Sequence, residues 1–156
     1  LGVEIMGLPT VLDRADFVII CCALNDDTHH LIGEAELKRM KKSAHLINVA
    51  RGPIVNQKAL TTALQEGHIA GAALDVFEEE PVDSNEPLLQ LDNVIASPHA
   101  LSWTDESFRM MGESAFAGIL AASEGREPHH VVNKQVIESE RFQAKLAACA
   151  ERRQRG

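Results

Sequence analysis

The chain has 156 residues, of which 45% are hydrophobic and 4% aromatic, and it contains no Tyr. This length suits one domain, with a core built mostly from Ala, Val, Leu and Ile. The formal net charge of −8 argues against a nucleic-acid-binding protein, which needs clustered Lys and Arg. The basic cluster of Arg152, Arg153 and Arg155 is predicted to be a solvated tail.

Membrane insertion, secretion and metal binding are also disfavoured. No apolar stretch is long enough for a transmembrane helix, and the chain does not start with the basic segment of a signal peptide. Cys21, Cys22 and Cys149 have neither disulfide-framework nor metal-site spacing. The adjacent histidine pairs at 29–30 and 129–130 lie in loops, and we expect no metal there. The sequence predicts a cytoplasmic protein.

Helical and apolar strand-like segments alternate along the chain. In chain order we predict a helix at 9–14, a strand at 17–22, helices and strands in turn at 33–42, 44–49, 56–66 and 69–76, a strand at 94–96, a long helix at 103–123 and a final helix at 138–152. The first strand is a continuous apolar run, which predicts burial on both faces, with Cys21 and Cys22 pointing to opposite sides.

The later helices have recognisable packing and termination signals. Leu60 and Leu64 are spaced i, i+4, and Gly67 is a stop signal for their helix. The long helix can be capped by Thr104, and Met110 and Met111 are expected to pack against the fold. Phe142, Leu146 and Ala150 form one apolar stripe on the final helix.

Strands that alternate with helices of this length indicate βαβ units and a parallel sheet, with helices on both faces. Ligands bind such sheets beyond the carboxyl ends of the strands. This rule directs attention to the loops that follow the four predicted strands.

Arg51 follows the second predicted strand directly, and Gly52-Pro53 then forces a turn. A guanidinium in this position can present a planar pair of donors to a carboxylate. The alternative is an Arg that pairs with a structural acid.

The third predicted strand ends at Asp75 and Val76 and is followed by three glutamates. Asp75 needs a partner because it ends a buried strand. Glu80 precedes Pro81, which restricts its backbone. Glu78 and Glu79 are interpreted as part of a solvated acidic loop.

His99 follows the fourth predicted strand, next to Pro98. A single His is more often structural than catalytic, but this one stands at a parallel-strand end. Arg51, Glu80 and His99 together are consistent with acid–base chemistry on a small carboxylate, in which the carboxylate of Glu80 orients the imidazole.

Three motifs, occurring in this order, resemble the D-isomer-specific 2-hydroxyacid dehydrogenase family, which includes phosphoglycerate, glycerate/hydroxypyruvate and formate dehydrogenases. They are Leu46 to Gly52, Gly71 to Pro81 and Asn93 to His99, and the resemblance extends from about residue 3 to residue 133. It implies a Rossmann-type domain that binds NAD or NADP and acts on a small 2-oxo or 2-hydroxy acid.

The resemblance also implies a role for individual residues. Arg51 would bind the substrate, His99 would be the acid–base group and Glu80 its carboxylate partner. Residues expected along the cofactor are Ala23, Thr28, Val49, Ala50, Arg51, Asp75, His99 and Ala100. Ala23 lies in a stretch, Ala23-Leu24-Asn25, where relatives commonly have Pro-Leu-Thr.

The family's glycine-rich turn, G-x-G-x-x-G after a strand, does not occur in this sequence. We therefore expect residues 1–133 to be part of a dinucleotide-binding domain without its first strands. Residues 134–156 are expected to form a helical segment that packs on a substrate domain in the family. The chain starts with Leu1 and not Met, which also suggests an excised part.

Two further expectations follow. The chain alone should be inactive, and the alternative function is a non-catalytic interaction or dimerisation module, like the corepressors of this family.

We also expect a homodimer or larger assembly, because the strand at 17–22 would be an apolar edge strand and the final helix would lack its docking surface. Trp103 could line a pocket or pack in the core or at an interface.

Overall fold

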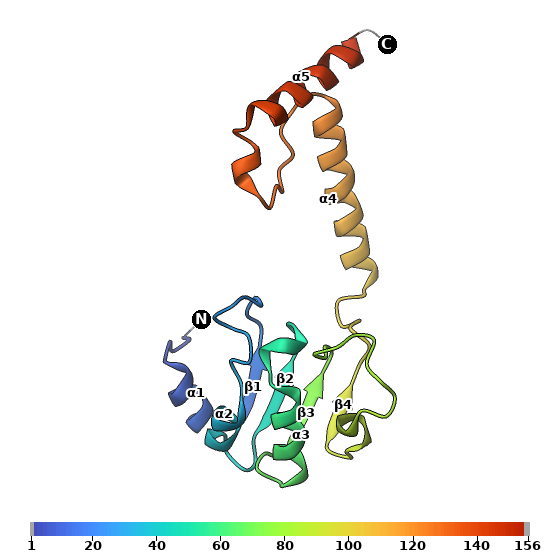
Figure 1. Cartoon of the computed structure of the whole chain (residues 1–156). Coiled ribbons are helices and arrows are strands. Elements are labelled where there is room, and N and C mark those ends of the chain that lie inside the picture. Colours follow the sequence, from blue (N-terminus) through green and yellow to red (C-terminus); the bar gives the residue numbers. More distant parts are fainter. Residues whose placement is uncertain (1, 155–156) are drawn as a thin grey trace. The chain divides into compact units, whose positions relative to one another are not determined.

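The computed structural model describes residues 2–154, with the side chain of Gln154 excluded. The chain forms two compact units, divided between Leu101 and Ser102 (Figure 1). The sequence instead predicts a boundary between residues 133 and 134, because residues 134–156 are expected to pack on a substrate domain. It differs from this division and stays a prediction.

The first unit is a parallel α/β structure, as predicted. Its elements are α1 (Leu8–Arg14), β1 (Phe17–Ile20), α2 (Glu34–Arg39), β2 (His45–Asn48), the 3-10 helix η1 (Gly52–Ile54), α3 (Gln57–Gln65), β3 (Gly71–Leu74), the 3-10 helix η2 (Pro87–Gln90) and β4 (Val94–Ala96). The sheet has the order β1-β2-β3-β4, and all neighbouring strands are parallel. The four carboxyl ends therefore share one edge.

Local signals in the sequence explain why α3 forms where it does. The Asn56 side chain caps the helix by accepting from the Ala59 amide at 2.9 Å. Leu60 and Leu64 are buried, and Gly67, with φ of +66°, follows the helix in the left-handed region that glycine tolerates. The predicted helix is confirmed, and it is shorter by one residue at each end.

The first strand corrects one expectation. Val18 and Ile20 are buried, but Phe17 and Ile19 remain 64% and 58% exposed. Successive side chains of a strand point to opposite faces. In this unit the helices between consecutive strands lie on one face, because the right-handed crossovers all advance in the same direction. Only that face is covered within residues 2–101, so the continuous apolar run did not predict the burial pattern. The expectation of helices on both faces of the sheet is likewise not met in this unit.

The positions of Cys21 and Cys22 also differ from what the sequence predicted. The strand ends at Ile20, so Cys21 and Cys22 lie in the loop that follows. Both are exposed and neither forms a disulfide. They do not point to opposite faces of a strand, as the sequence had suggested.

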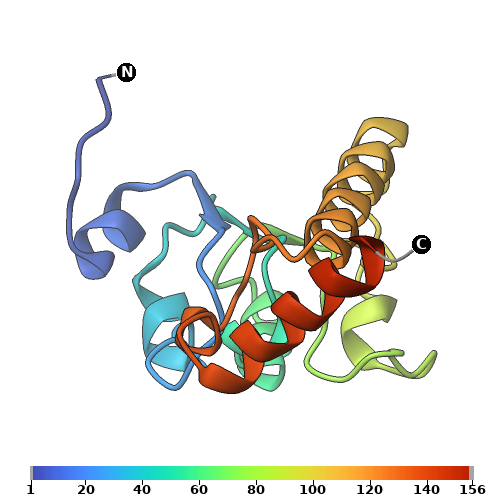
Figure 2. The same cartoon turned by 90° about the horizontal axis from the view of Figure 1, so that it is seen from above.

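The second unit contains α4 (Asp105–Ser123), the 3-10 helix η3 (Lys134–Val136) and α5 (Glu140–Gln154). Thr104 caps α4 through the Ser107 amide at 3.2 Å, as predicted. Beyond α4 the chain passes through Gly125 at φ of +74° and turns back, and α5 crosses the end of α4 (Figure 2). Leu146 is buried at this crossing, where Gly125 meets Leu146 and Ala150. The apolar stripe of α5 thus has a packing surface inside this unit.

The apolar side chains of α4 are largely exposed. Only Ala121 of this helix is buried, whereas Phe116 and Ile119 are 67% and 69% exposed. Met110 and Met111 are also exposed, which corrects the expectation that they pack against the fold. Trp103 is exposed as well, and its ring lies near that of Phe108.

The basic residues near the C-terminus are not a free tail. Arg152 and Arg153 belong to α5, and Arg153 forms an ion pair with Glu124. Arg155 lies outside the described residues. Within residues 2–154, no helix is both long and apolar enough to span a membrane.

Candidate active site

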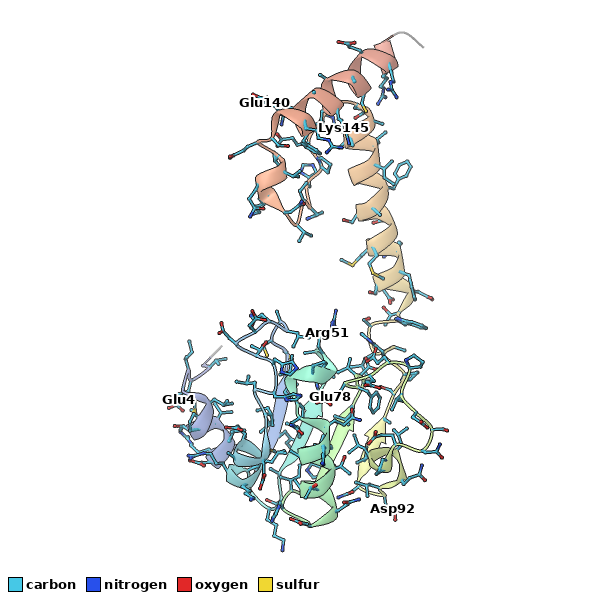
Figure 3. All side chains as sticks on the ribbon, viewed as in Figure 1. Glu4, Arg51, Glu78, Asp92, Glu140 and Lys145 are labelled. Atoms are coloured by element: carbon cyan, nitrogen blue, oxygen red, sulfur yellow. The ribbon has the colours of Figure 1, made fainter. Side chains whose placement is uncertain are left out.

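The loops after β1, β2, β3 and β4 converge at the carboxyl edge of the sheet. Figure 3 shows Arg51 beyond the strand ends of the first unit. His99, Glu80 and Asp75 belong to the loops that follow β4 and β3 at the same edge. The predicted catalytic residues therefore come from three adjacent strands.

The loop that carries Arg51 is shaped by Asn48, the last residue of β2. Asn48 is buried, and its side chain accepts from the Ala50 amide at 3.1 Å and donates to the Arg51 carbonyl at 2.9 Å. The guanidinium of Arg51 donates from Nη1 to the Ala50 carbonyl at 2.6 Å. The Arg51 side chain is exposed, and it forms no ion pair with an acidic side chain within residues 2–154.

Gly52 is required by a close approach of two loops. A Cβ atom at this position would lie 1.8 Å from the carbonyl oxygen of Phe77, so no other residue fits without backbone movement. The loop after β2 is thereby pressed against the loop after β3.

His99 and Glu80 are hydrogen-bonded as predicted: the Nδ1 atom of His99 lies 2.8 Å from the Oε2 atom of Glu80. A carboxylate can only accept, so Nδ1 carries the proton and Nε2 is the ring nitrogen left for a substrate. His99 has φ of +54°, an uncommon conformation for a residue other than glycine. Both side chains are partly exposed.

Three groups around Glu80 favour its ionised form. Burial by itself raises the pKa of Glu80, but hydrogen bonds from His99 and from the Phe77 amide, together with the charges of His99 and Arg51, lower this pKa below its usual value. The Phe77 amide donates to Oε1 at 3.0 Å. Glu80 is therefore a carboxylate that accepts from Nδ1 and can orient the imidazole of His99.

Asp75 organises the loop in which His99 lies. It is buried, and its carboxylate accepts from the Ser97 hydroxyl at 2.6 Å and from the amides of Ala100 and Leu101 at 2.9 and 3.0 Å. Burial raises the pKa of Asp75, but these three donors and the nearby His99 lower it overall. The sequence predicts a partner for the buried carboxylate of Asp75, and these three donors from residues around His99 fill that role.

The loop after β1 is closed by Thr28. Its hydroxyl donates to the Ala23 carbonyl at 2.7 Å and accepts from the Asn25 amide at 2.8 Å. The roles of Thr28 and Ala23 toward a cofactor stay predictions.

A cavity of about 690 Å³ opens between the ends of β1 and β2. It is lined by Cys21, Cys22, Ala23, Leu24, Val49, Ala50 and Arg51. Four of the residues predicted to lie along the cofactor thus share one cavity. Another cavity, of about 870 Å³, runs along α4 and residues 128–130 in the second unit.

The interpretation of Glu78 as a solvated residue is wrong. Glu78 is half-buried, and its Oε1 atom lies 2.7 Å from Nε2 of His30 and accepts from the Gln57 amide at 3.1 Å. Its neighbour Glu79 is exposed, as predicted. No local signal separates these two glutamates, because the partners of Glu78 are 48 and 21 positions away in the sequence.

Among residues 2–154, no three His, Cys, Asp or Glu side chains are arranged to hold a metal ion.

The family model described as D-isomer specific 2-hydroxyacid dehydrogenase, NAD binding domain, matches residues 1–100. A glyoxylate reductase of Korarchaeum cryptofilum (strain OPF8) is 46% identical over 137 residues, which are 88% of this chain and 41% of that protein. The chain thus spans about two fifths of the length of this relative.

Two similar solved structures contain cofactor. A D-isomer specific 2-hydroxyacid dehydrogenase from Lactobacillus delbrueckii ssp. bulgaricus, in an NAD-complexed form, is 37% identical, with a TM-score of 0.73 over 82% of this chain and 43% of that chain. One from Xanthobacter autotrophicus Py2, in complex with NADPH and MES, is 35% identical, with a TM-score of 0.70 over 83% of this chain and 52% of that chain.

Proposed function

Because this chain belongs to the D-isomer-specific 2-hydroxyacid dehydrogenase family, we propose that it carries the acid–base half of an NAD- or NADP-dependent active site. The reaction is the interconversion of a small 2-oxo acid and the corresponding D-2-hydroxy acid. The observation that carries the proposal is the 2.8 Å contact between His99 Nδ1 and Glu80 Oε2 at the carboxyl edge of a parallel sheet.

In this proposal each residue acts at one defined atom. Arg51 binds the substrate carboxylate with its guanidinium and polarises the adjacent carbonyl. His99 donates a proton from Nε2 to the developing alkoxide during reduction and removes it from the hydroxyl during oxidation. Glu80, which is kept ionised, accepts from Nδ1 and fixes the orientation of the imidazole.

The residues at the strand ends fit the nicotinamide half of the cofactor. A cavity of about 690 Å³ is lined by Ala23, Val49, Ala50 and Arg51, four of the residues proposed to contact it. The bound cofactor would supply the hydride at C4 of its nicotinamide ring. Thr28, Asp75, His99 and Ala100 complete the proposed contact set around the same edge.

A hybrid enzyme tests this function directly. The matched 137 residues of the Korarchaeum cryptofilum glyoxylate reductase would be replaced by those of this chain, which are 46% identical. We expect NADH or NADPH to be consumed with glyoxylate or hydroxypyruvate, followed by absorbance. A folded hybrid that binds NADH but does not turn over would favour the non-catalytic module instead.

The 156-residue chain by itself should show no turnover in the same assay, because it has no glycine-rich loop to hold the cofactor pyrophosphate. This assay serves as the background for the hybrid. Measurable turnover by the chain alone would contradict the proposed contribution of the loop.

We further propose that the chain forms a homodimer or larger assembly in the cytoplasm. The exposed apolar residues of α4 support this assembly, and so does β1, whose exposed Phe17 and Ile19 lie at an edge of the sheet. The cytoplasmic location is supported by three cysteines that are all free in the structure.

A further inference from the structure

We infer that Glu78 is a positioning residue that fixes the loop after β1, the loop proposed to lie along the cofactor. This inference rests on the proposed function for its kinetic consequences, but its structural basis is independent. Glu78 contacts two other segments: its Oε1 atom lies 2.7 Å from Nε2 of His30 in the loop after β1 and accepts from the Gln57 amide at the start of α3 at 3.1 Å.

The contact is reciprocal on the α3 side. The Glu78 amide donates to the side-chain Oε1 of Gln57 at 3.1 Å, so two hydrogen bonds join Glu78 and Gln57. Nearby, Gly52 approaches the Phe77 and Glu78 backbone closely enough to exclude a Cβ atom. The Glu78 backbone is therefore fixed, and its carboxylate is a defined anchor for whatever contacts it.

His30 is the residue that this anchor holds. It has φ of +52°, a conformation that a non-glycine residue rarely adopts without support. Its amide donates to the Pro53 carbonyl at 2.8 Å, and its Nδ1 lies 3.5 Å from Nδ2 of Asn56. A ring that donates from Nε2 to Glu78 and accepts at Nδ1 from Asn56 satisfies all three groups.

The same loop also contains Ala23 and Thr28, two of the residues proposed to contact the cofactor. Thr28 lies two residues before His30, and its hydroxyl closes the loop onto Ala23. The Leu31 amide donates to the Thr28 carbonyl at 3.2 Å, which joins the Thr28 turn to the segment that contains His30. Loss of the Glu78 anchor should therefore loosen the loop at Thr28 and Ala23.

The catalytic pair does not depend on this anchor. Glu80 is held by its own hydrogen bonds to the Phe77 amide and to His99. The structure thus predicts a separation in kinetic effect: loss of Glu78 should weaken cofactor binding and leave proton transfer intact.

Glu79 provides a matched control, because it is the same residue type in the same loop but is exposed. We expect Glu78→Ala to raise the exchange rate of the Gln57 amide in the full chain by about tenfold, because this amide loses its acceptor. The His30 amide, which donates to Pro53, should also exchange faster, because the loop that holds it is loosened. Glu79→Ala should leave them unchanged. Glu78→Gln retains an acceptor oxygen and should restore most of the protection, so it guards against general misfolding of the Ala variant.

In the hybrid enzyme, Glu78→Ala should raise KM for NADH about tenfold and change kcat less than about twofold. Unchanged amide exchange in Glu78→Ala, or equal effects of the Glu78 and Glu79 variants, would overturn the inference. A fall in kcat without a rise in KM would overturn it too. A hybrid that is inactive even with Glu78 present would count against the proposed function, and the exchange measurement would still decide the role of Glu78.

Discussion

Asp75 is the buried carboxylate on which the loop containing His99 depends. Its three donors are the Ser97 hydroxyl and the amides of Ala100 and Leu101. Asp75→Asn removes the charge and should lower the free energy of unfolding at pH 7 by about 2 kcal/mol, as expected for hydrogen bonds to a charged group. Urea unfolding would measure this. Asp92→Asn, at an exposed residue, is the control and should change little.

The same residue predicts how stability depends on pH. The pKa of Asp75 is lowered from its ordinary value of 3.8, so its stabilising contribution is present above that value and is lost as pH falls through the folded-state pKa. Glu80 should likewise contribute stability that is lost as the pH falls, because its pKa is lowered from the ordinary value of 4.5. Acid titration should show stability falling below about pH 4, less steeply in Asp75→Asn. An unchanged acid profile in the variant would contradict this assignment.

Individual residues also show what the sequence could predict. The common location of Arg51, Glu80 and His99 was predicted because each comes after a strand, and the carboxyl ends of parallel strands share one edge of the sheet. Glu78 and His30 were missed because their contact joins residues 48 positions apart, and nothing local distinguishes Glu78 from Glu79. Ser97 was missed for the same reason: its hydroxyl contacts Asp75, 22 positions earlier.

At the scale of elements, strand and helix positions followed from periodicity and capping, whereas burial did not. The apolar run at Phe17 to Ile20 predicted a strand, but exposure of Phe17 and Ile19 depends on which face the helices cover. That face is set by the direction of the crossovers, which a single apolar run does not encode.

The contact between η1 and the loop after β3 gives a prediction about Gly52. In Gly52→Ala the new Cβ would lie 1.8 Å from the Phe77 carbonyl oxygen, so one of the two loops must move. We expect a loss of about 3 kcal/mol in unfolding free energy, at the upper end for overpacking. Gly7→Ala is the control, because its nearest neighbour would be 3.9 Å away. A Gly52 variant as stable as the Gly7 variant would contradict the close approach.

At the scale of the whole molecule, the exposed apolar side chains of α4 predict self-association. Phe116 and Ile119 lie three residues apart on this helix and are both more than two-thirds exposed. Phe116→Ser should raise the dissociation constant of the dimer at least about 30-fold, the effect of losing a central contact. Ser114→Ala, at an exposed residue on the opposite side of the same helix, should have little effect. Sedimentation would measure both, and a stable monomer of the unaltered chain at tens of micromolar would refute the assembly.

His99 is proposed to transfer the proton in the dehydrogenase reaction, and kcat of the hybrid enzyme tests this role most directly. His99→Ala should lower kcat with glyoxylate by roughly 10²–10⁴, the usual contribution of a general acid–base group. His129→Ala, at an exposed residue of the second unit, should leave kcat unchanged. A His99→Ala hybrid with near-normal kcat would contradict the account.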